Sequence, residues 1–152
     1  MKITTSYIDR ELFYLTSEED WQSQIPTDNW CLILISNSEN QKVIDRIISA
    51  SISNNVGYVC GIGTKHDYIH TETDSEYALR DIGESKFPRP KYHVLTVGDE
   101  DFDEGMWFGL NLTFNRDVEI HKILIIDTDC KGKEVIEKLI GKFEEGYLPD
   151  EK

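Results

Sequence analysis

Four short apolar runs alternate with longer amphipathic segments between about residues 30 and 147 of the chain. The runs lie at residues 31–35, 56–62, 92–97 and 120–126, and each is short enough to form one β-strand. Each run is followed by a stretch that can form a helix, and this alternation is typical of a parallel sheet covered by helices. The sequence therefore predicts an α/β fold, a single-domain three-layer sandwich over residues 1–152 with a mainly parallel sheet of four or five strands.

The first run, residues 31–35, is unbroken, which is typical of a strand buried on both faces at the centre of a sheet. The middle residues of the four runs should occupy the sheet centre, with helices covering both faces: Ile33, Val59, Leu95 and Leu124. The segment before residue 30 is less regular. It predicts a short edge strand at residues 12–15 and then a helix that begins at Ser17 and ends at Pro26.

Helices are predicted between and after the strands. Residues 36–38 can cap the first of them, which should end at Asn54 and Asn55. After the second strand we expect a loop that carries His66, and then a short helix at residues 74–82. One later helix should bury an apolar face made of Met106, Trp107, Leu110 and Phe114. The last helix should end near Gly146 and bury Val135, Ile136, Leu139, Ile140 and Phe143.

Charge narrows the class of partner. The 152 residues include 29 acidic and 16 basic side chains, so the formal net charge is −13. Such a surface repels phosphate backbones, which argues against a nucleic-acid partner. The most basic stretch, residues 131–142, alternates lysine with glutamate and is typical of a solvated helix face. A basic protein partner or a metal ion suits this charge better.

No apolar run is long enough for a signal peptide or a membrane span. The three cysteines, Cys31, Cys60 and Cys130, are far apart and lie in or beside apolar runs, as buried thiols in a reducing compartment do. We therefore expect a soluble cytoplasmic protein that uses no cofactor and binds no membrane. The oligomeric state stays open.

The carboxyl ends of parallel strands meet at one edge of a sheet, where ligands of open α/β sheets bind. We refer to this edge as the rim. It should carry five carboxylates, with two more just behind them on a helix: Asp99, Glu100, Asp101, Asp127 and Asp129, then Asp103 and Glu104. Acidic residues of this kind can cap helices and solvate the surface, bind a partner, or hold a metal.

A metal is the alternative hypothesis for the rim. Asp127-x-Asp129 after an apolar strand resembles the paired aspartates of Toprim and receiver-type metal sites. That resemblance implies a Mg²⁺-dependent phosphoryl-transfer or hydrolase domain that uses Asp99, Asp127 and Asp129. The glutamate that a Toprim site adds would have to be Glu39.

Other catalytic patterns are weaker. Gly61-x-Gly63 lacks the third glycine of a dinucleotide loop, and no P-loop is present. His66 and His70 have the spacing of zinc ligands on a helix, but the residues around them favour a loop. The carboxylates beside Cys130 should raise the pKa of its thiol and make it a poor nucleophile.

Two resemblances bear on function. One segment of the chain is similar to a segment of small uncharacterised bacterial α/β domains. It contains His93-Val-Leu-Thr96, then Asp99-Glu100, Glu104 and Trp107-Phe108. The small, acidic chain without a catalytic signature also resembles, in type, the immunity proteins of polymorphic-toxin and contact-dependent inhibition systems. This second resemblance implies a non-enzymatic immunity or antitoxin protein that neutralises a basic toxin domain by direct binding.

The partner-binding residues predicted on this hypothesis are Asp99, Glu100, Asp101, Asp103, Glu104 and Trp107. Either Trp107 or its neighbour Phe108 should lie outside the core face of the helix, because adjacent helical residues point in different directions. A structural or regulatory subunit is a third interpretation.

Overall fold

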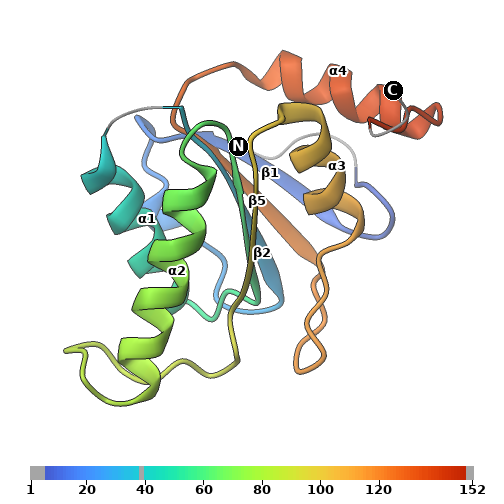
Figure 1. Cartoon of the computed structure of the whole chain (residues 1–152). Helices are drawn as coiled ribbons and strands as arrows, with labels where there is room; N and C mark the ends of the chain where they lie inside the picture. The colour runs from blue at the N-terminus through green and yellow to red at the C-terminus, as the bar shows by residue number, and fades with distance from the viewer. Residues whose placement is uncertain (1–5, 38–39, 150–152) are drawn as a thin grey trace.

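The computed structural model describes residues 6–37 and 40–149, which form one α/β domain around a five-stranded parallel sheet (Figure 1). The strand order is β1-β5-β2-β3-β4, and every neighbouring pair is parallel. The strands are β1 (Glu11–Thr16), β2 (Trp30–Ile35), β3 (Tyr58–Ile62), β4 (Leu95–Asp99) and β5 (Lys122–Asp127). The predicted fold class is therefore confirmed, and residues 12–15 do form an edge strand.

Helices cover both faces of the sheet. On one face lie α1 (Gln41–Ser53) and α2 (His66–Asp81), and on the other lie α3 (Phe102–Asn111) and α4 (Lys133–Glu144). Side chains alternate between the faces along each strand, so the sheet separates two apolar cores. The core under α3 and α4 contains Ile33, Cys60 and Ile62, and the core under α1 and α2 contains Leu32, Leu34 and Val59.

The expected sheet centre is correct at three of four positions. Ile33, Val59 and Leu124 are buried, but Leu95 is 37% exposed. Leu95 is the first residue of β4, which is an edge strand, so no further strand covers its outer side. Its apolar run could not reveal that position, because strand order is not encoded in the run itself.

The helix predicted from Ser17 to Pro26 is wrong, since this segment contains only a single 3₁₀ turn, Gln22–Gln24. Its acidic side chains bond to the local backbone instead. Glu19 accepts from the N–H of Thr16 at 2.9 Å, and Asp20 accepts from the hydroxyl of Ser23 at 2.7 Å. Such local bonds stabilise turns in place of a helix.

The predicted cap of α1 is also wrong. Ser36 is buried at the end of β2, where its N–H donates to the carbonyl of Ile62, and Ser38 falls outside the described residues. The cap is Asn40, whose side chain accepts from the N–H of Val43. The end of the helix is as predicted, at Asn54.

The loop predicted around His66 is wrong, because α2 begins at that residue and runs for 16 residues. Gly63, with φ of 107°, makes the turn just before it. The apolar pattern predicts only part of this helix, because a buried cation as well as apolar side chains attaches it to α1. Arg80 is 1% exposed and donates to Glu76 and to the hydroxyl groups of Ser49 and Ser53.

The apolar face of α3 is shorter than the sequence predicted. Met106 and Leu110 are buried, but the helix ends at Asn111, and Phe114 lies beyond it and is 69% exposed. Thr113, just after the helix, is buried, and its hydroxyl donates to the carbonyl of Gly109. In α4 the predicted core positions are buried except Val135, which is 46% exposed.

The cysteine prediction is correct for Cys31 and Cys60, which are buried, and wrong for Cys130, which is exposed in the turn after β5. None of the described helices is long and apolar enough to cross a bilayer.

Candidate functional site

The carboxyl ends of the strands form one continuous rim, as predicted. Asn37, after β2, donates to the carboxylate of Asp129, after β5, from both its backbone N–H and its side-chain amide. The side-chain nitrogen lies 2.6 Å from the carboxylate oxygen. The side-chain oxygen of Asn37 accepts from the N–H of Thr64, after β3, at 2.7 Å. The N–H of Gly63 donates to the carbonyl of Asp99, at the end of β4. These bonds tie the ends of β5, β2, β3 and β4 together.

The carboxylate of Asp127 is enclosed in the protein. Asp127 is 0% exposed and accepts three hydrogen bonds, from the hydroxyl of Tyr14 at 2.7 Å and from the N–H groups of Lys131 and Asp129 at 2.6 and 3.0 Å. Burial and the negative charge of Asp127 raise the pKa of Tyr14 well above its usual value. Asp127 thus fixes the turn after β5 and has no oxygen directed to solvent.

The three carboxylates of the metal hypothesis do not converge. Asp99 ends β4 and Asp127 ends β5, and two strands, β2 and β3, lie between them. Strand spacing places these two strand ends roughly 14 Å apart, too far for both to bind one ion. The described residues contain no group of three or more His, Cys, Asp and Glu side chains that could hold a metal, and Glu39 lies outside them.

The other predicted acidic residues do gather, at the start of α3. We call Asp99, Glu100, Asp101, Asp103 and Glu104 the acidic corner. Asp99 accepts from the N–H of Asp101 at 2.9 Å, and Asp101 caps α3 by accepting from the N–H of Glu104 at 2.8 Å. Asp103 accepts from the hydroxyl of Tyr147 at 2.7 Å. Three of these carboxylates therefore also shape the corner itself.

Two glycines let α3 lie close to the sheet. A Cβ on Gly105 would lie 2.7 Å from Cγ1 of Ile62, and a Cβ on Gly109 would lie 2.6 Å from Cδ1 of Ile33. Both distances are far below an ordinary carbon–carbon contact. Because its underside lacks side chains at these positions, the helix packs closely, and its bulky residues project from its flanks.

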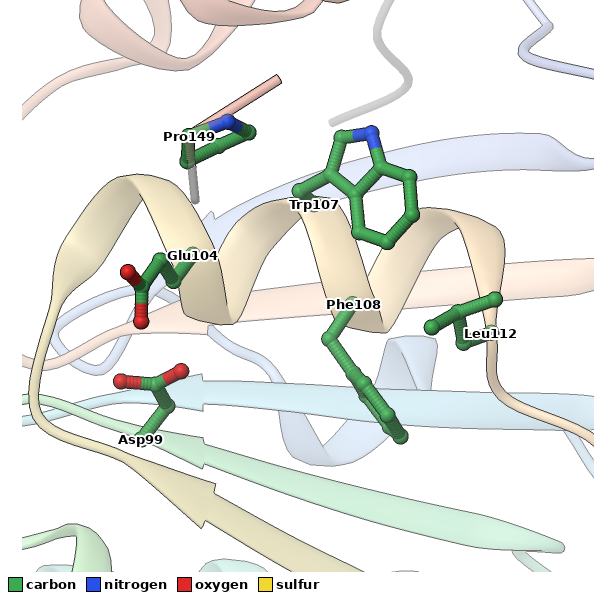
Figure 2. Close-up of a pocket in the computed structure, with 6 residues that line it drawn as sticks. All are labelled: Asp99, Glu104, Trp107, Phe108, Leu112 and Pro149. Carbon is green, nitrogen blue, oxygen red and sulfur yellow. The ribbon is translucent and has the colours of Figure 1, made fainter. Parts of the chain in front are cut away.

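One flank of α3 forms a groove with the end of β4 (Figure 2). Glu104, Phe108 and Leu112 recur at a spacing of four residues, so they share this flank. We use "the groove" for a cavity of about 200 Å³ lined by Asp99, Glu104, Trp107, Phe108, Leu112 and Pro149. Figure 2 shows the carboxylates of Asp99 and Glu104 at one end, and Phe108 and Leu112 farther along.

Trp107 and Phe108 are both half-buried, and both line the groove. Phe108 packs against Tyr58, with ring centroids 6.2 Å apart, and Figure 2 shows Trp107 and Pro149 both on the upper side of the helix. The sequence pattern predicted Trp107 as a site residue but did not predict Leu112 or Pro149. The spacing from Glu104 through Phe108 was a signal for Leu112. Pro149 could not be placed, because it packs back onto α3 from the end of the chain.

The remaining sequence candidates lie outside the groove. His66 and His70 occupy the first turns of α2, and each has an aspartate 3.5 Å from a ring nitrogen. Partial loss of solvation at the thiol and the charges of Glu18, Asp127 and Asp129 raise the pKa of Cys130, as the sequence predicted.

Comparison with protein families gives a match over residues 10–146 to the model of a family described as a domain of unknown function, DUF7684. No curated protein and no solved structure matches the chain.

Proposed function

We propose that this chain, which belongs to the DUF7684 family, is an acidic protein-binding module that neutralises a basic toxin domain by direct binding, as an immunity protein does. The observation that carries the proposal is the position of the acidic corner directly beside the groove. Charge and apolar surface, the two components of a protein interface, thus occur together at one place.

The charge of the corner suits a cationic partner. Glu100 and Asp101 are exposed, and the chain as a whole is strongly acidic. Lys131 reaches this region, with its Nζ 5.2 Å from the ring centroid of Phe102, and offsets one of the five negative charges. The net field of the corner stays negative. Such a field accelerates encounter with a basic protein and disfavours acidic ones.

The groove supplies the apolar part of the proposed interface. Stable interfaces place aromatic anchors at a centre from which water is excluded, inside a polar rim. Trp107 and Phe108 are half-buried before any partner binds, so little side-chain entropy remains to be lost on binding. The acidic corner would form part of the surrounding polar rim.

The test measures binding to a basic domain encoded beside the gene for this chain, using two matched variants. The corner variant combines Glu100→Lys with Asp103→Asn, which leaves the cap Asp101 intact and keeps an oxygen to accept from Tyr147. The control variant combines Glu119→Lys with Asp117→Asn. These two exposed acidic residues lie just before β5, at the amino ends of the strands and so on the side of the sheet opposite the rim. Both variants change the net charge by the same amount.

We expect the corner variant to bind at least about tenfold more weakly, mainly through slower association, and the control to bind nearly as the wild type does. Association of the wild type should slow as salt rises, because exposed charges are screened beyond about 8–10 Å. Equal losses in both variants would show that only overall charge matters. A failure to bind any basic neighbouring domain would refute the immunity proposal.

The alternative function, a Mg²⁺-dependent phosphoryl-transfer or hydrolase domain, has no comparable support, since Asp99 lies two strands away from Asp127 and Asp129, and Asp127 is fully buried.

A further inference from the structure

One side of β4 has unpaired backbone groups. β4 is an edge strand, and on its β3 side the N–H of Leu95 donates to Gly57 while the carbonyl of Asp99 accepts from Gly63. Successive residues of a strand direct their backbone groups to opposite sides, so the N–H and C=O groups of Thr96 and Gly98 point away from β3. None of the described strands pairs with them there. We call this the free side of β4; in Figure 1 the strand, in dark yellow, runs between α2 and α3.

β4 lacks the features that usually keep an edge strand from pairing. Such strands often carry lysine or proline, or contain a bulge. The sequence of β4, Leu-Thr-Val-Gly-Asp, has no lysine or proline, and its one-to-one register with β3 leaves no bulge. At the other edge strand, β1, the N–H of Thr16 already donates to Glu19. The free side of β4 is therefore suited to accept a further strand.

An uncovered apolar strip lies beside the free side, on the face of the sheet that carries α3. We use "the apolar strip" for Leu95, Val97, Phe108 and Leu112. Val97 faces this way because its register partner, Cys60, belongs to the core under α3 and α4. Leu95 is 37% exposed and Leu112 is 50% exposed, while Val97 and Phe108 are half-buried. A second sheet that continued from β4 would cover this strip.

Charge is divided along the direction of β4. Residues 86–98 contain three basic side chains and no Asp or Glu, whereas residues 99–101 are all acidic. Two of the basic side chains, Arg89 and Lys91, each have an acidic neighbour, yet they are 73% and 57% exposed. A second copy in antiparallel orientation would place its basic segment beside these acids, and its acids beside this basic segment. A parallel copy would place like charges together, which is unfavourable.

We infer that β4 pairs with β4 of a second copy of this chain, antiparallel about Val97, so that two five-stranded sheets join into one in a two-fold symmetric dimer. In this register Thr96 of each copy lies opposite Gly98 of the other, and the backbone groups on both free sides are paired. The two apolar strips meet across the axis. Each chain has a formal net charge of −13, so a contact between two copies has to match opposite charges locally, as this arrangement does.

This inference does not rest on the proposed function, because the dimer forms from this chain alone. Phe108 and Leu112 of the apolar strip also line the groove. A second copy and the basic domain would therefore exclude one another.

The first test changes residue 96 in two ways. Thr96→Pro replaces the outward N–H with the proline ring and leaves the bonds to β3 intact, as proline does on an edge strand. Thr96→Val is the matched control, since it keeps the N–H, and the buried hydroxyl that it removes has no hydrogen-bond partner in the described part of the chain. Sedimentation velocity over a concentration series measures dimerisation. We expect the wild type and Thr96→Val to dimerise equally, and Thr96→Pro to dimerise at least about tenfold more weakly.

The second test uses exposed charges and does not depend on the folding of the proline variant. Lys91→Glu should weaken the dimer, because it places like charges side by side. Adding Glu100→Lys to it restores opposite charges in an antiparallel dimer, so dimerisation should return to within about threefold of the wild type. Adding Glu119→Lys instead restores the net charge equally, but before β5, three strands from β4, and should not rescue the dimer.

Amide hydrogen exchange of Thr96 and Gly98, followed by NMR, locates the contact, and circular dichroism checks that each variant is folded. Exchange at both residues should slow as the dimer forms. A chain that stays monomeric throughout the series would refute the inference. A dimer that leaves this exchange unchanged, or that Glu100→Lys and Glu119→Lys rescue equally well, would show that the copies meet through another surface.

Discussion

Two helical glycines of this chain should respond in opposite ways to the same substitution. Gly109 lies in α3 against the sheet, where a Cβ would be 2.6 Å from Cδ1 and 2.9 Å from Cγ1 of Ile33. Gly141 lies in α4, where a Cβ would meet no atom within 4 Å. Neither glycine has a positive φ, so alanine can adopt both backbone conformations. Only the space available differs.

The magnitudes follow from two terms. Replacing a glycine inside a helix with alanine stabilises the helix by about 0.5–1 kcal/mol. At Gly141 nothing opposes that gain, so Gly141→Ala should raise the free energy of unfolding by this amount. At Gly109 the added methyl group pushes on Ile33, which is fully buried in the central strand, and overpacking of this kind costs about 1–3 kcal/mol. Gly109→Ala should therefore be neutral to destabilising by about 2 kcal/mol.

Urea unfolding followed by circular dichroism measures both variants against the wild type. We expect the midpoint of Gly141→Ala to lie above the wild-type value and that of Gly109→Ala to lie at or below it, with unchanged slopes, because neither substitution alters the surface exposed on unfolding. If Gly109→Ala stabilised the protein as much as Gly141→Ala does, α3 could not pack tightly against Ile33. Close approach of α3 to the sheet would then no longer account for the shape of the groove.

Three further outcomes are expected. The raised pKa of Tyr14 means that the folded protein favours the protonated hydroxyl, so the free energy of unfolding should fall as pH rises above about 10. In Tyr14→Phe this fall should be less steep, and an equally steep fall in both proteins, measured by urea unfolding at each pH, would contradict the prediction. In the native protein a disulfide reagent should modify Cys130 alone, and slowly, because burial raises the pKa of Cys31 to about 12 and that of Cys60 also; rapid modification of two thiols would disprove it. Millimolar Mg²⁺ should leave the melting temperature unchanged, since the oxygens of Asp127 are occupied; a rise that Asp127→Asn abolishes would favour the metal hypothesis.

The strands and the rim could be predicted because local patterns encode them. An apolar run such as residues 31–35 marks a buried strand wherever it lies in the sheet, and parallel strands bring their carboxyl ends to one edge. The acidic corner follows from the same rule. Strand order is a property of the whole fold, however, so neither the exposure of Leu95 nor the separation of Asp99 from Asp127 could be derived from the runs.

The groove was only partly predictable, for a related reason. Its width depends on how closely α3 approaches the sheet, and that depends on Gly105 and Gly109 meeting particular isoleucines on other strands. A glycine inside a helical pattern does not reveal what it packs against. The burial of Asp127 was hidden in the same way, because its partner Tyr14 lies on β1, far away in the sequence.

The place of β5 between β1 and β2 affects how the chain can fold while it is being synthesised. β1 leaves the ribosome before β5, yet among the described strands β5 is the one that pairs with it, and β5 begins at Lys122, more than a hundred residues later. Until then β1 lacks the strand with which it pairs, and the facing edge of β2 is uncovered as well. Insertion of β5 closes both edges in one step. The assembly of this domain is therefore expected to be late and cooperative, and its nascent chain would be most vulnerable to misassembly just before that step.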